Sequence, residues 1–511
     1  MKPRARRKDI RVRTAHAATG AVMGLTWLTL PLLTPPPPAP AISTPHPHHT
    51  TTTAPEPDRT ADLLPLLVAA TALGFAAYTH RRRTRRAGTR TTPALVSPAP
   101  PTPTPLESER QTRAALVRTD DCIRTSEEEL SFAATQLAPD TLAPFTDALR
   151  RAHTEFSAAA AIWRRYEESG ATDTNTRRHA QTGVLGRCAE AGRLLDARAD
   201  PLDRLRALEE APARPLARAE SRFRALTPRT AAASATTAEL RRLHTPSAVT
   251  GIAGYVEQAK DRLVFATARL NESHQRADRG EPYDAARQLR AAEGAVVQAE
   301  VLIGAVERLA AALREAAALV PPALTAAESH LGGVRAGRAP AAVASADLAA
   351  RLARADAALA AVRTGLTSGP YDPLDALRWI VRAVEDLETG LPGALRAAAR
   401  LVAGTAVAAA DDFVGVHRGV TGARARARLS AAQRALDSEN FVDADTLAGE
   451  ARELAERDVL AHSAPDTAAH QRAAGGLAGA VLGGVLLAEE PDAGPPACFG
   501  GPETRARRRA R

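Results

Sequence analysis

Apolar residues recur every three or four positions along much of this chain, which is the spacing that places side chains on one face of an α-helix. Two such seams flank a breaker at residues 278–282. The first is formed by Ile252, Val256, Ala259, Leu263, Ala266 and Leu270. The second is formed by Leu289, Ala292, Val296, Ala299, Ile303, Val306, Ala310 and Leu313. Both follow the stepping of coiled-coil seams, and the short breaker predicts that the two helices pair antiparallel.

In this hairpin the seam residues should be buried together, whereas the charged residues beside them should stay solvated. These charged residues are Glu257, Arg262, Arg269, Glu300 and Arg308. The alternation of large residues with Ala along each seam should let the two helices approach closely. We therefore expect the seams, and no charged side chain, to form the core of the hairpin.

The same pattern of two apolar seams separated by a short breaker recurs further along the chain. A third seam is formed by Leu348, Leu352, Ala355, Leu359, Val362 and Leu366, and beyond the breaker at 368–370 it is followed by Leu377, Ile380, Val384 and Leu387. Residues 425–458 read as two short helices broken at 437–440, which resembles a single tetratricopeptide-like pair; without a repeat, a plain hairpin is the simpler interpretation. The acidic cluster 125–129 is typical of the first turn of a helix. Residues 106–461 are thus predicted to be an elongated all-α array of antiparallel coiled-coil hairpins.

Two apolar segments near the N-terminus indicate a membrane protein. The stretch 17–33 follows a basic region and precedes a small-residue site ending at Ala41, so residues 1–41 are predicted to be a signal peptide or an uncleaved signal anchor. Residues 63–79 carry no charge and are followed by an Arg cluster at 81–86, as at the cytoplasmic end of a transmembrane helix. We expect a cell-membrane protein with one span, or two if the first segment is uncleaved, and with most of the chain in the cytoplasm.

The remaining segments read as linkers and a tail. Residues 42–62 form a short Pro/Thr-rich extracytoplasmic linker, and 80–105 a basic, then Pro-rich linker. Residues 462–511 are predicted to be a Gly-containing apolar run followed by a flexible, Arg-rich tail. Glycines every fourth position within 475–488 suggest self-association or contact with the membrane, while a flexible low-complexity segment is the alternative.

Composition and charge sharpen this interpretation. Hydrophobic residues make up 45% of the chain but aromatic residues only 3%, which argues against an all-β fold. The formal net charge is +9, yet the excess arginines and lysines concentrate in 2–13, 81–90 and 505–511, and the rest of the chain is slightly acidic. A face that neutralises nucleic-acid phosphates is therefore not expected in the helical body.

No catalytic, cofactor-binding or metal-binding residue can be nominated. Cys122, Cys188 and Cys498 are too few and too scattered for a zinc site or a disulfide framework, and no P-loop, HExxH or GxSxG motif occurs. Asp120–Asp121 and Asp411–Asp412 are adjacent carboxylates, but neighbours on a helix point about 100° apart and should not converge. His46, His48 and His49 lie in a spacer that cannot fix metal geometry.

Several stretches resemble a known family. Residues 113–136, 187–210 and 291–313, together with the Gly-rich and Arg-rich C-terminus that ends FGGPETRARRRAR, are similar to the cytoplasmic helical region of actinobacterial TPM-domain-containing membrane proteins. In that family the TPM domain is extracytoplasmic and is linked to phosphatase and calcium-binding roles. Residues 42–62 are too few to build such a domain, so the resemblance implies a family member without it, and no catalytic or calcium-binding residue carries over.

These features together predict a membrane-anchored helical scaffold that binds protein partners and has no enzymatic activity. The alternative is a phosphatase-like hydrolase, which rests on the family name alone. A third interpretation is recruitment to nucleic acid through the arginine-rich tails.

Overall fold

The computed structural model describes residues 104–170, 173–338, 345–385, 387, 391, 393–463 and 498–510. Within these ranges all regular secondary structure is helical and no strand occurs, which confirms the predicted all-α class. The predicted signal segment, linkers and membrane span before residue 104 lie outside the described residues, as does the apolar run 475–488. Among the helices that are described, none combines the length and apolar character that crossing a bilayer requires.

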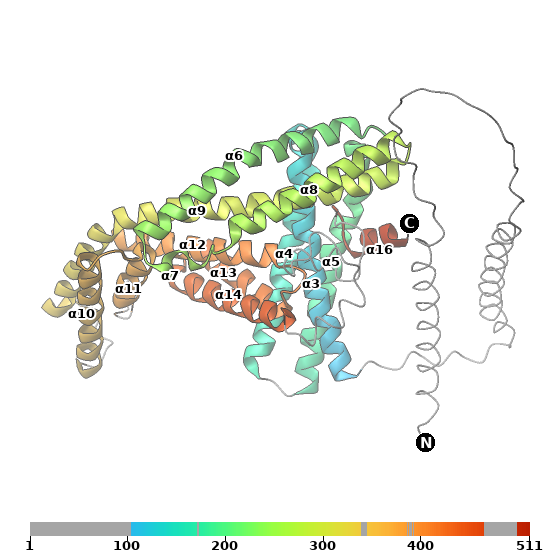
Figure 1. The fold of residues 1–511 in the computed structure, drawn as a ribbon. Coiled ribbons are helices and arrows are strands. Elements are labelled where there is room, and N and C mark those ends of the chain that lie inside the picture. The colour runs from blue at the N-terminus through green and yellow to red at the C-terminus, as the bar shows by residue number, and fades with distance from the viewer. Residues whose placement is uncertain are drawn as a thin grey trace, which may run out of the picture. The chain divides into compact units, whose positions relative to one another are not determined.

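All described residues lie in one compact unit, and their helices are long (Figure 1). In chain order they are α3 (Pro105–Ala133), α4 (Pro139–Ser169), α5 (Thr174–Arg206), α6 (Ala213–Leu243), α7 (Pro246–Thr250), α8 (Tyr255–Asp278), α9 (Pro282–Gly333), a π-helical turn (Val334–Arg338), α10 (Ser345–Thr367), α11 (Pro373–Glu385), α12 (Ala394–Val416), α13 (Ala423–Asp437), α14 (Phe441–Ser463) and α16 (Pro502–Ala510).

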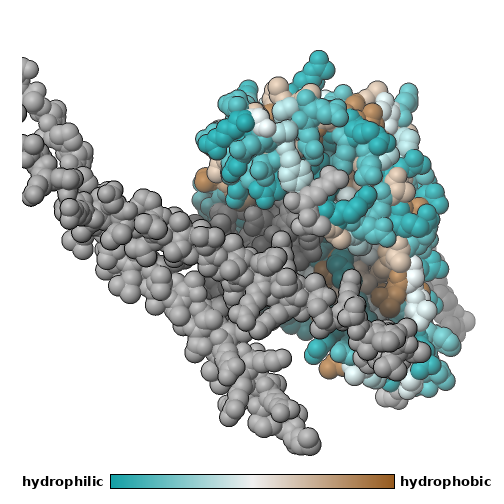
Figure 2. All heavy atoms as spheres, turned by 90° about the vertical axis from the view of Figure 1, so that its right-hand side faces the viewer, coloured by the Kyte–Doolittle hydropathy of each residue, from teal (hydrophilic) through white to brown (hydrophobic). Residues whose placement is uncertain are grey.

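The helices bury two apolar clusters. The helices α3, α4 and α5 lie side by side and enclose one cluster, which includes Trp163 and Phe156. The other cluster extends through the helices from α6 to α14. Of these, α6, α8 and α9 run across the first three helices, whereas α10 and α11 lie away from them (Figure 1). Figure 2 shows one face of the described residues, on which hydrophilic residues predominate and apolar ones form small separate patches outside the area that grey atoms cover. The apolar material is thus largely internal.

The 52-residue helix α9 is the central element of the larger cluster, with α6, α8, α11 and α12 packed against it. Its seam residues Leu289, Val296, Ile303 and Leu313 are fully buried. It follows α8 after a three-residue turn in which Gly280 has a φ of +74°, a value that glycine adopts without strain. The two helices therefore form a closely packed pair, while their coiled-coil geometry stays a prediction.

The seam predicted for α8 is wrong at one step. Arg262, expected to be solvated, is fully buried, whereas Leu263 is only half-buried. The buried stripe runs through Val256, Ala259, Arg262, Ala266 and Leu270. It can pass through residue 262 in place of 263 because the positions three and four residues after Ala259 lie on the same side of a helix. The Nε of Arg262 lies 3.4 Å from Gln298, and burial lowers the pKa of this guanidinium to about 10.

The other charged residues beside the seams divide into two groups. Glu257 and Arg308 are exposed, as expected. Arg269 and Glu300 are instead half-buried: Arg269 stacks over the ring of Phe265 at 4.7 Å, and Glu300 accepts hydrogen bonds from Arg222. Long charged side chains can therefore cover apolar surface at the edge of a seam.

The N-terminal start of α3 corrects a second expectation. The acidic cluster 125–129 lies deep inside α3 rather than in a first turn. The helix begins instead at Pro105, where the Thr104 hydroxyl accepts a hydrogen bond from the N–H of Glu107 and the Glu107 carboxylate accepts one from the N–H of Thr104. This capping box satisfies two of the backbone donors that a helix start leaves free. Residues 125–129 are consequently available for contacts between helices.

The predicted break between the two last long helices is present, with α13 ending at Asp437 and α14 beginning at Phe441. Of the residues that apolar spacing predicts to face each other across this break, all are buried except Leu436, which is half-buried; the buried ones are Leu429, Ala432, Phe441, Ala444, Ala448 and Ala451. In α10 and α11 the residues of the third seam are likewise buried or half-buried. Apolar spacing is therefore a reliable guide to the buried side of these helices.

The core assignment of α9 predicts that an Ala→Asp substitution has different effects on stability at a buried and at an exposed position. Ala299→Asp would bury a charge at a fully buried site and should lower the free energy of unfolding by about 3 kcal/mol or more. Ala311→Asp places the same side chain at an exposed position of the same helix and should change stability by less than about 0.5 kcal/mol. Urea unfolding of the two full-length variants measures both, and equal midpoints would show that this face of α9 is not in the core.

Candidate functional site

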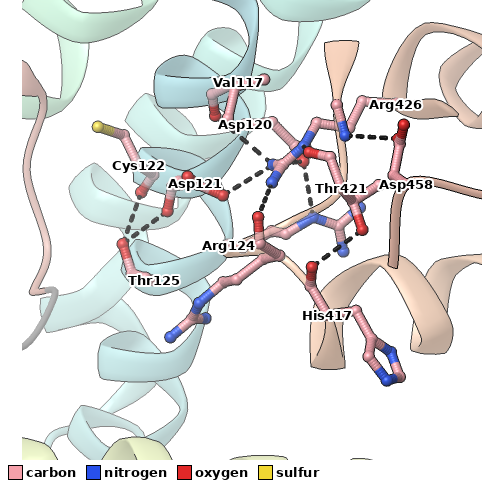
Figure 3. A network of polar contacts seen from close by, with 12 residues as sticks. Val117, Asp120, Asp121, Cys122, Arg124, Thr125, His417, Thr421, Arg426 and Asp458 are labelled. Atoms are coloured by element: carbon pink, nitrogen blue, oxygen red, sulfur yellow. Dashed lines mark hydrogen bonds and ion pairs between the residues drawn. The ribbon is translucent and has the colours of Figure 1, made fainter. Parts of the chain in front are cut away.

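Charged side chains converge where α3 meets α13, around the buried guanidinium of Arg426 (Figure 3). Its Nη1 lies 2.5 Å from Asp120 and 2.7 Å from Asp121. Its remaining donors reach backbone carbonyls, Nη2 that of Arg418 at 2.6 Å and Nε that of Thr421 at 3.1 Å. The prediction that Asp120 and Asp121 do not converge is therefore wrong, because one guanidinium between the helices is within reach of both carboxylates.

A second arginine connects the two aspartate pairs singled out in the sequence. Arg124 donates through Nε to Asp120 at 2.9 Å and through Nη2 to Asp411 at 2.9 Å, which joins α3 to α12. Asp412 points elsewhere and accepts a hydrogen bond of 2.6 Å from Arg308. The pair Asp411–Asp412 thus diverges, as expected. Each of these carboxylates is bound by an arginine.

These arginines determine the protonation of the buried carboxylate. Burial alone would raise the pKa of Asp120, but the charges of Arg124 and Arg426 outweigh it and hold the pKa below its ordinary value. Asp412 shows the opposite balance, since burial raises its pKa despite the bond from Arg308. Asp120 is therefore a permanently charged anchor at neutral pH.

A small pocket of about 80 Å³ adjoins this cluster and is lined by Glu127, His153 and Gln433 besides the charged residues above. Burial of the Glu127 carboxyl, together with the nearby charges of Asp411 and Asp120, raises its pKa to about 7. Such a volume admits a few water molecules, whereas drug-sized ligands occupy pockets of roughly 300 Å³ or more. Within the described part of the chain, no three His, Cys, Asp or Glu side chains gather closely enough to hold a metal ion.

A second ionic cluster lies where α3, α5 and α9 meet. The guanidinium of Arg206 is fully buried and contacts Glu129 at 2.8 Å and Glu293 at 2.6 Å. Burial would raise the pKa of Glu129, but Arg206, Arg290 and Arg508 outweigh it and lower the pKa to about 2. Charge-assisted pairs of this kind are the strongest polar contacts between helices in a protein interior.

The C-terminal segment Cys498–Ala510, called the tail below, docks on α3 and α5 and corrects the prediction of a flexible tail. Phe499 is buried and its N–H donates to Glu129 at 2.5 Å. Its ring meets that of Phe145 edge to face, with centroids 6.0 Å apart. The N–H of Gly500 donates to the hydroxyl of Ser126 at 3.2 Å. Residues 126 and 129 of the misassigned acidic cluster are therefore receptors for the tail.

One carboxylate of α5 caps the tail helix α16. Asp196 accepts hydrogen bonds from the N–H groups of Gly501 at 2.8 Å, Glu503 at 3.3 Å and Thr504 at 2.9 Å, and from the hydroxyl of Thr504 at 2.5 Å. A carboxylate at a helix N-terminus satisfies free donors and complements the helix dipole. Asp196 thus acts as an N-cap supplied by another part of the chain.

Arginines of the tail pair with α3 and α5. Arg505 donates to the carbonyl of Asp121 at 2.9 Å and to the hydroxyl of Thr125 at 2.6 Å. Arg508 forms an ion pair with Asp203. The basic side chains that the sequence suggested for an anionic membrane surface are therefore engaged within the protein at these two positions.

Glycines make the close approach of the tail possible. A Cβ on Gly501 would lie 2.3 Å from the carbonyl oxygen of Gly192 in α5, and a Cβ on Gly192 would lie 2.8 Å from Pro502. Gly500 has a φ of +138°, which other residues rarely adopt. We define the tail groove as the surface of α3 and α5 around Ser126, Glu129, Gly192 and Asp196. Its shape is matched to a Gly-Gly-Pro sequence.

The three cysteines are free and buried. Burial raises the pKa of the Cys122 thiol to about 12 and that of Cys498 to about 11, and it also raises that of Cys188. Thiols with such pKa values stay protonated at neutral pH, which makes them poor nucleophiles. They pack as small apolar side chains.

The depressed pKa of Glu129 predicts how stability depends on pH. Its contribution is fully present above the ordinary pKa of about 4.5 and is lost as pH falls toward its folded value of about 2. Glu129→Gln should therefore cost on the order of 3 kcal/mol at pH 7, because buried arginines lose a partner, and progressively less as the pH approaches 2.

Urea unfolding at pH 7, 4 and 2.5 measures this difference in the free energy of unfolding, the gap, between the native chain and the variant. Glu257→Gln is the control, since Glu257 is exposed and the substitution should leave the unfolding midpoint at pH 7 unchanged. A gap for Glu129→Gln that stays constant with pH would contradict the ionic role assigned to this carboxylate.

Comparison with known proteins found no matching family model and no matching solved structure. The chain is 30% identical over 417 residues to UPF0603 protein Rv2345 of Mycobacterium tuberculosis (strain ATCC 25618 / H37Rv) and, to the same extent, to UPF0603 protein MT2410 of Mycobacterium tuberculosis (strain CDC 1551 / Oshkosh). The matches cover 74% of this chain and 61% of each relative. The TPM part of the resemblance stays a prediction, whereas the similarity to these mycobacterial UPF0603 proteins agrees with the predicted resemblance to an actinobacterial family.

Proposed function

We propose that this protein is a membrane-anchored helical scaffold that binds protein partners in the cytoplasm and catalyses no reaction itself. The observation that carries the proposal is that arginines bind the aspartate carboxylates singled out in the sequence. Asp120, Asp121, Asp411 and Asp412 are all held by arginines from other turns or other helices. Carboxylates engaged in this way fix the arrangement of helices and are not free to bind a substrate.

A surface groove offers a place for a partner. It measures about 600 Å³ and lies between α4, α13 and α14, and we call it the α4–α14 groove. Side chains of both signs line it, among them Arg164, Glu168, Arg428, Asp443 and Glu450. A lining with alternating charges suits a polar or amphipathic protein segment, because such a partner can match both signs.

The engaged tail also bears on the nucleic-acid alternative. Arg505 donates hydrogen bonds to Thr125 and Asp121, and Arg508 forms an ion pair with Asp203. Phosphate binding by these two side chains would require the tail to leave its groove. The membrane anchor, in turn, rests on the apolar segment 63–79 and the arginines that follow it.

The cytoplasmic orientation is testable with a cysteine placed at an accessible site. The native thiols are buried, so their failure to react would carry no information about topology. Glu239→Cys adds a thiol where the side chain is 63% exposed, near the end of α6. An impermeant maleimide should leave this variant unlabelled in intact cells and label it after permeabilisation.

The matched control is Thr52→Cys in the predicted extracytoplasmic linker, which should react in intact cells. Labelling of Glu239→Cys before permeabilisation, under conditions in which the native chain does not react, would reverse the orientation.

The scaffold role predicts partners that depend on the α4–α14 groove. Arg428→Glu should place a third acidic group beside Glu168 and Glu450, which Arg428 contacts at 2.6 and 3.3 Å. A partner bound at this groove should be depleted at least tenfold when the tagged full chain is purified from cross-linked membranes. Quantitative mass spectrometry of the co-purified proteins measures the depletion.

Arg242→Glu is the control, because this arginine is 72% exposed on α6, away from the groove. It should retain the partners of the native chain. If native, Arg428→Glu and Arg242→Glu chains co-purify the same proteins in the same amounts, the groove is not the scaffold's binding surface.

A further inference from the structure

The tail reaches its groove from a distant part of the sequence. The bond from Phe499 to Glu129 joins residues 370 positions apart, and that from Gly500 to Ser126 joins residues 374 positions apart. Residues 464–497 connect the end of α14 to the tail. Among the described residues, the tail contacts α3, α4, α5 and Tyr283 of α9. None of these contacts depends on the path that the connection takes.

We propose that the tail groove is a recognition site for the sequence Phe-Gly-Gly-Pro-Glu-Thr-Arg, and that a second copy of this chain can supply it, so that copies pair by exchanging tails. The proposal names one partner for the scaffold function proposed above. Its test needs neither the membrane anchor nor the α4–α14 groove, so the two proposals can fail separately.

Shape is the first reason why the occupant must carry this sequence. A Cβ on Gly501 would clash with the carbonyl of Gly192 and a Cβ on Gly192 with Pro502, and Gly500 adopts a φ of +138°. Phe499 fills an apolar site against Phe145 that is closed to solvent. An unrelated helical segment lacks a glycine pair directly behind a phenylalanine, whereas every copy of this chain has one.

Charge is the second reason. The groove presents the carboxylates of Glu129, Asp196 and Asp203, and the tail presents Arg505 and Arg508 together with the N-terminal donors of α16. Opposite charges on the two surfaces favour encounter as well as binding. A second copy carries both surfaces, which is the requirement for exchange of an identical element between protomers.

The length of the connection permits the exchange. Residues 464–497 can span up to about 110 Å when extended, which exceeds the length of about 78 Å of the 52-residue helix α9. The tail can therefore reach a groove on a neighbouring copy. Tethering nevertheless gives the chain's own tail an effective concentration near the millimolar range, so that isolated chains should close on themselves and exchange should require crowding of copies or a blocked contact.

A complementation experiment with full chains separates the two contacts. Phe499→Asp should disable the tail and leave the groove intact, and Gly192→Val should block the groove by its clash with Pro502 and leave the tail intact. The two variants carry different affinity tags and are mixed in detergent. We expect each variant alone to stay unpaired. In the mixture, the two differently tagged variants should co-purify. Their co-purification should exceed at least tenfold the background, which is given by the double variant mixed with Phe499→Asp.

A labelled peptide gives an independent measurement. The synthetic peptide of residues 498–511, with Cys498→Ser, should bind the Phe499→Asp chain in a fluorescence anisotropy titration. A Gly501→Ala peptide should bind at least tenfold more weakly, because its Cβ would meet the carbonyl of Gly192. If the Phe499→Asp chain fails to fold by circular dichroism, Gly501→Ala in the full chain replaces it as the tail-disabled variant.

Co-purification of the folded complementary pair together with the loss of affinity for the Gly501→Ala peptide would establish the recognition site. The absence of pairing between folded variants, or equal affinity for the two peptides, would overturn the proposal.

Discussion

Buried arginine–carboxylate pairs between helices are the constraint on which the arrangement of this protein depends. Its apolar faces are built largely from Ala, Leu and Val, and the hydrophobic effect that buries them is not directional. An ion pair does restrict how the helices cross, because leaving one partner buried and alone costs roughly 3–5 kcal/mol. We interpret Arg426 with Asp120, and Arg206 with Glu129 and Glu293, as the contacts that select one crossing of α3 with α13, α5 and α9.

Helix α3 can bear these pairs because polar residues share its buried surface with apolar ones. Thr112, Thr119, Asp120, Thr125, Ser126 and Glu129 are all nine-tenths or more buried. Several of the hydroxyls return their hydrogen bond to the helix itself, as Thr112 does to the carbonyl of Ser108 and Ser126 to that of Cys122. The helix therefore meets its neighbours with satisfied polar groups, and the two charged residues remain for pairing with other helices.

Sequence periodicity was sufficient to predict the helices and most of their buried faces, but not to predict which charged residues are buried. The seam of α9 and the break between α13 and α14 follow directly from apolar spacing. Arg262 and Glu129 were assigned to the surface or to a helix start because a charged residue is normally solvated, and their partners lie 36 and 77 positions away. Contacts at such separations depend on how helices cross, which the local pattern does not contain.

The tail was missed for a related reason. Its composition is that of a solvated basic segment, and only the succession Phe499, Gly500, Gly501 and Pro502 departs from this character. An aromatic residue followed by two glycines can be recognised as a signal of close packing only when the complementary surface is known. That surface belongs to α3 and α5, more than 300 residues earlier in the chain.

The tail touches both ionic clusters and so couples them. Arg505 donates to the carbonyl of Asp121, whose carboxylate lies beside Arg426, while the N–H of Phe499 donates to Glu129 in the cluster of Arg206. Binding of the tail therefore favours the same crossing of α3 that the ion pairs select, and by linkage a well-formed α3 crossing favours binding of the tail. Because the coupling acts through α3 itself, it holds equally for a tail that comes from the same chain and for one supplied by another copy. The ionic interior and the docking of the tail thus share α3 as their common element.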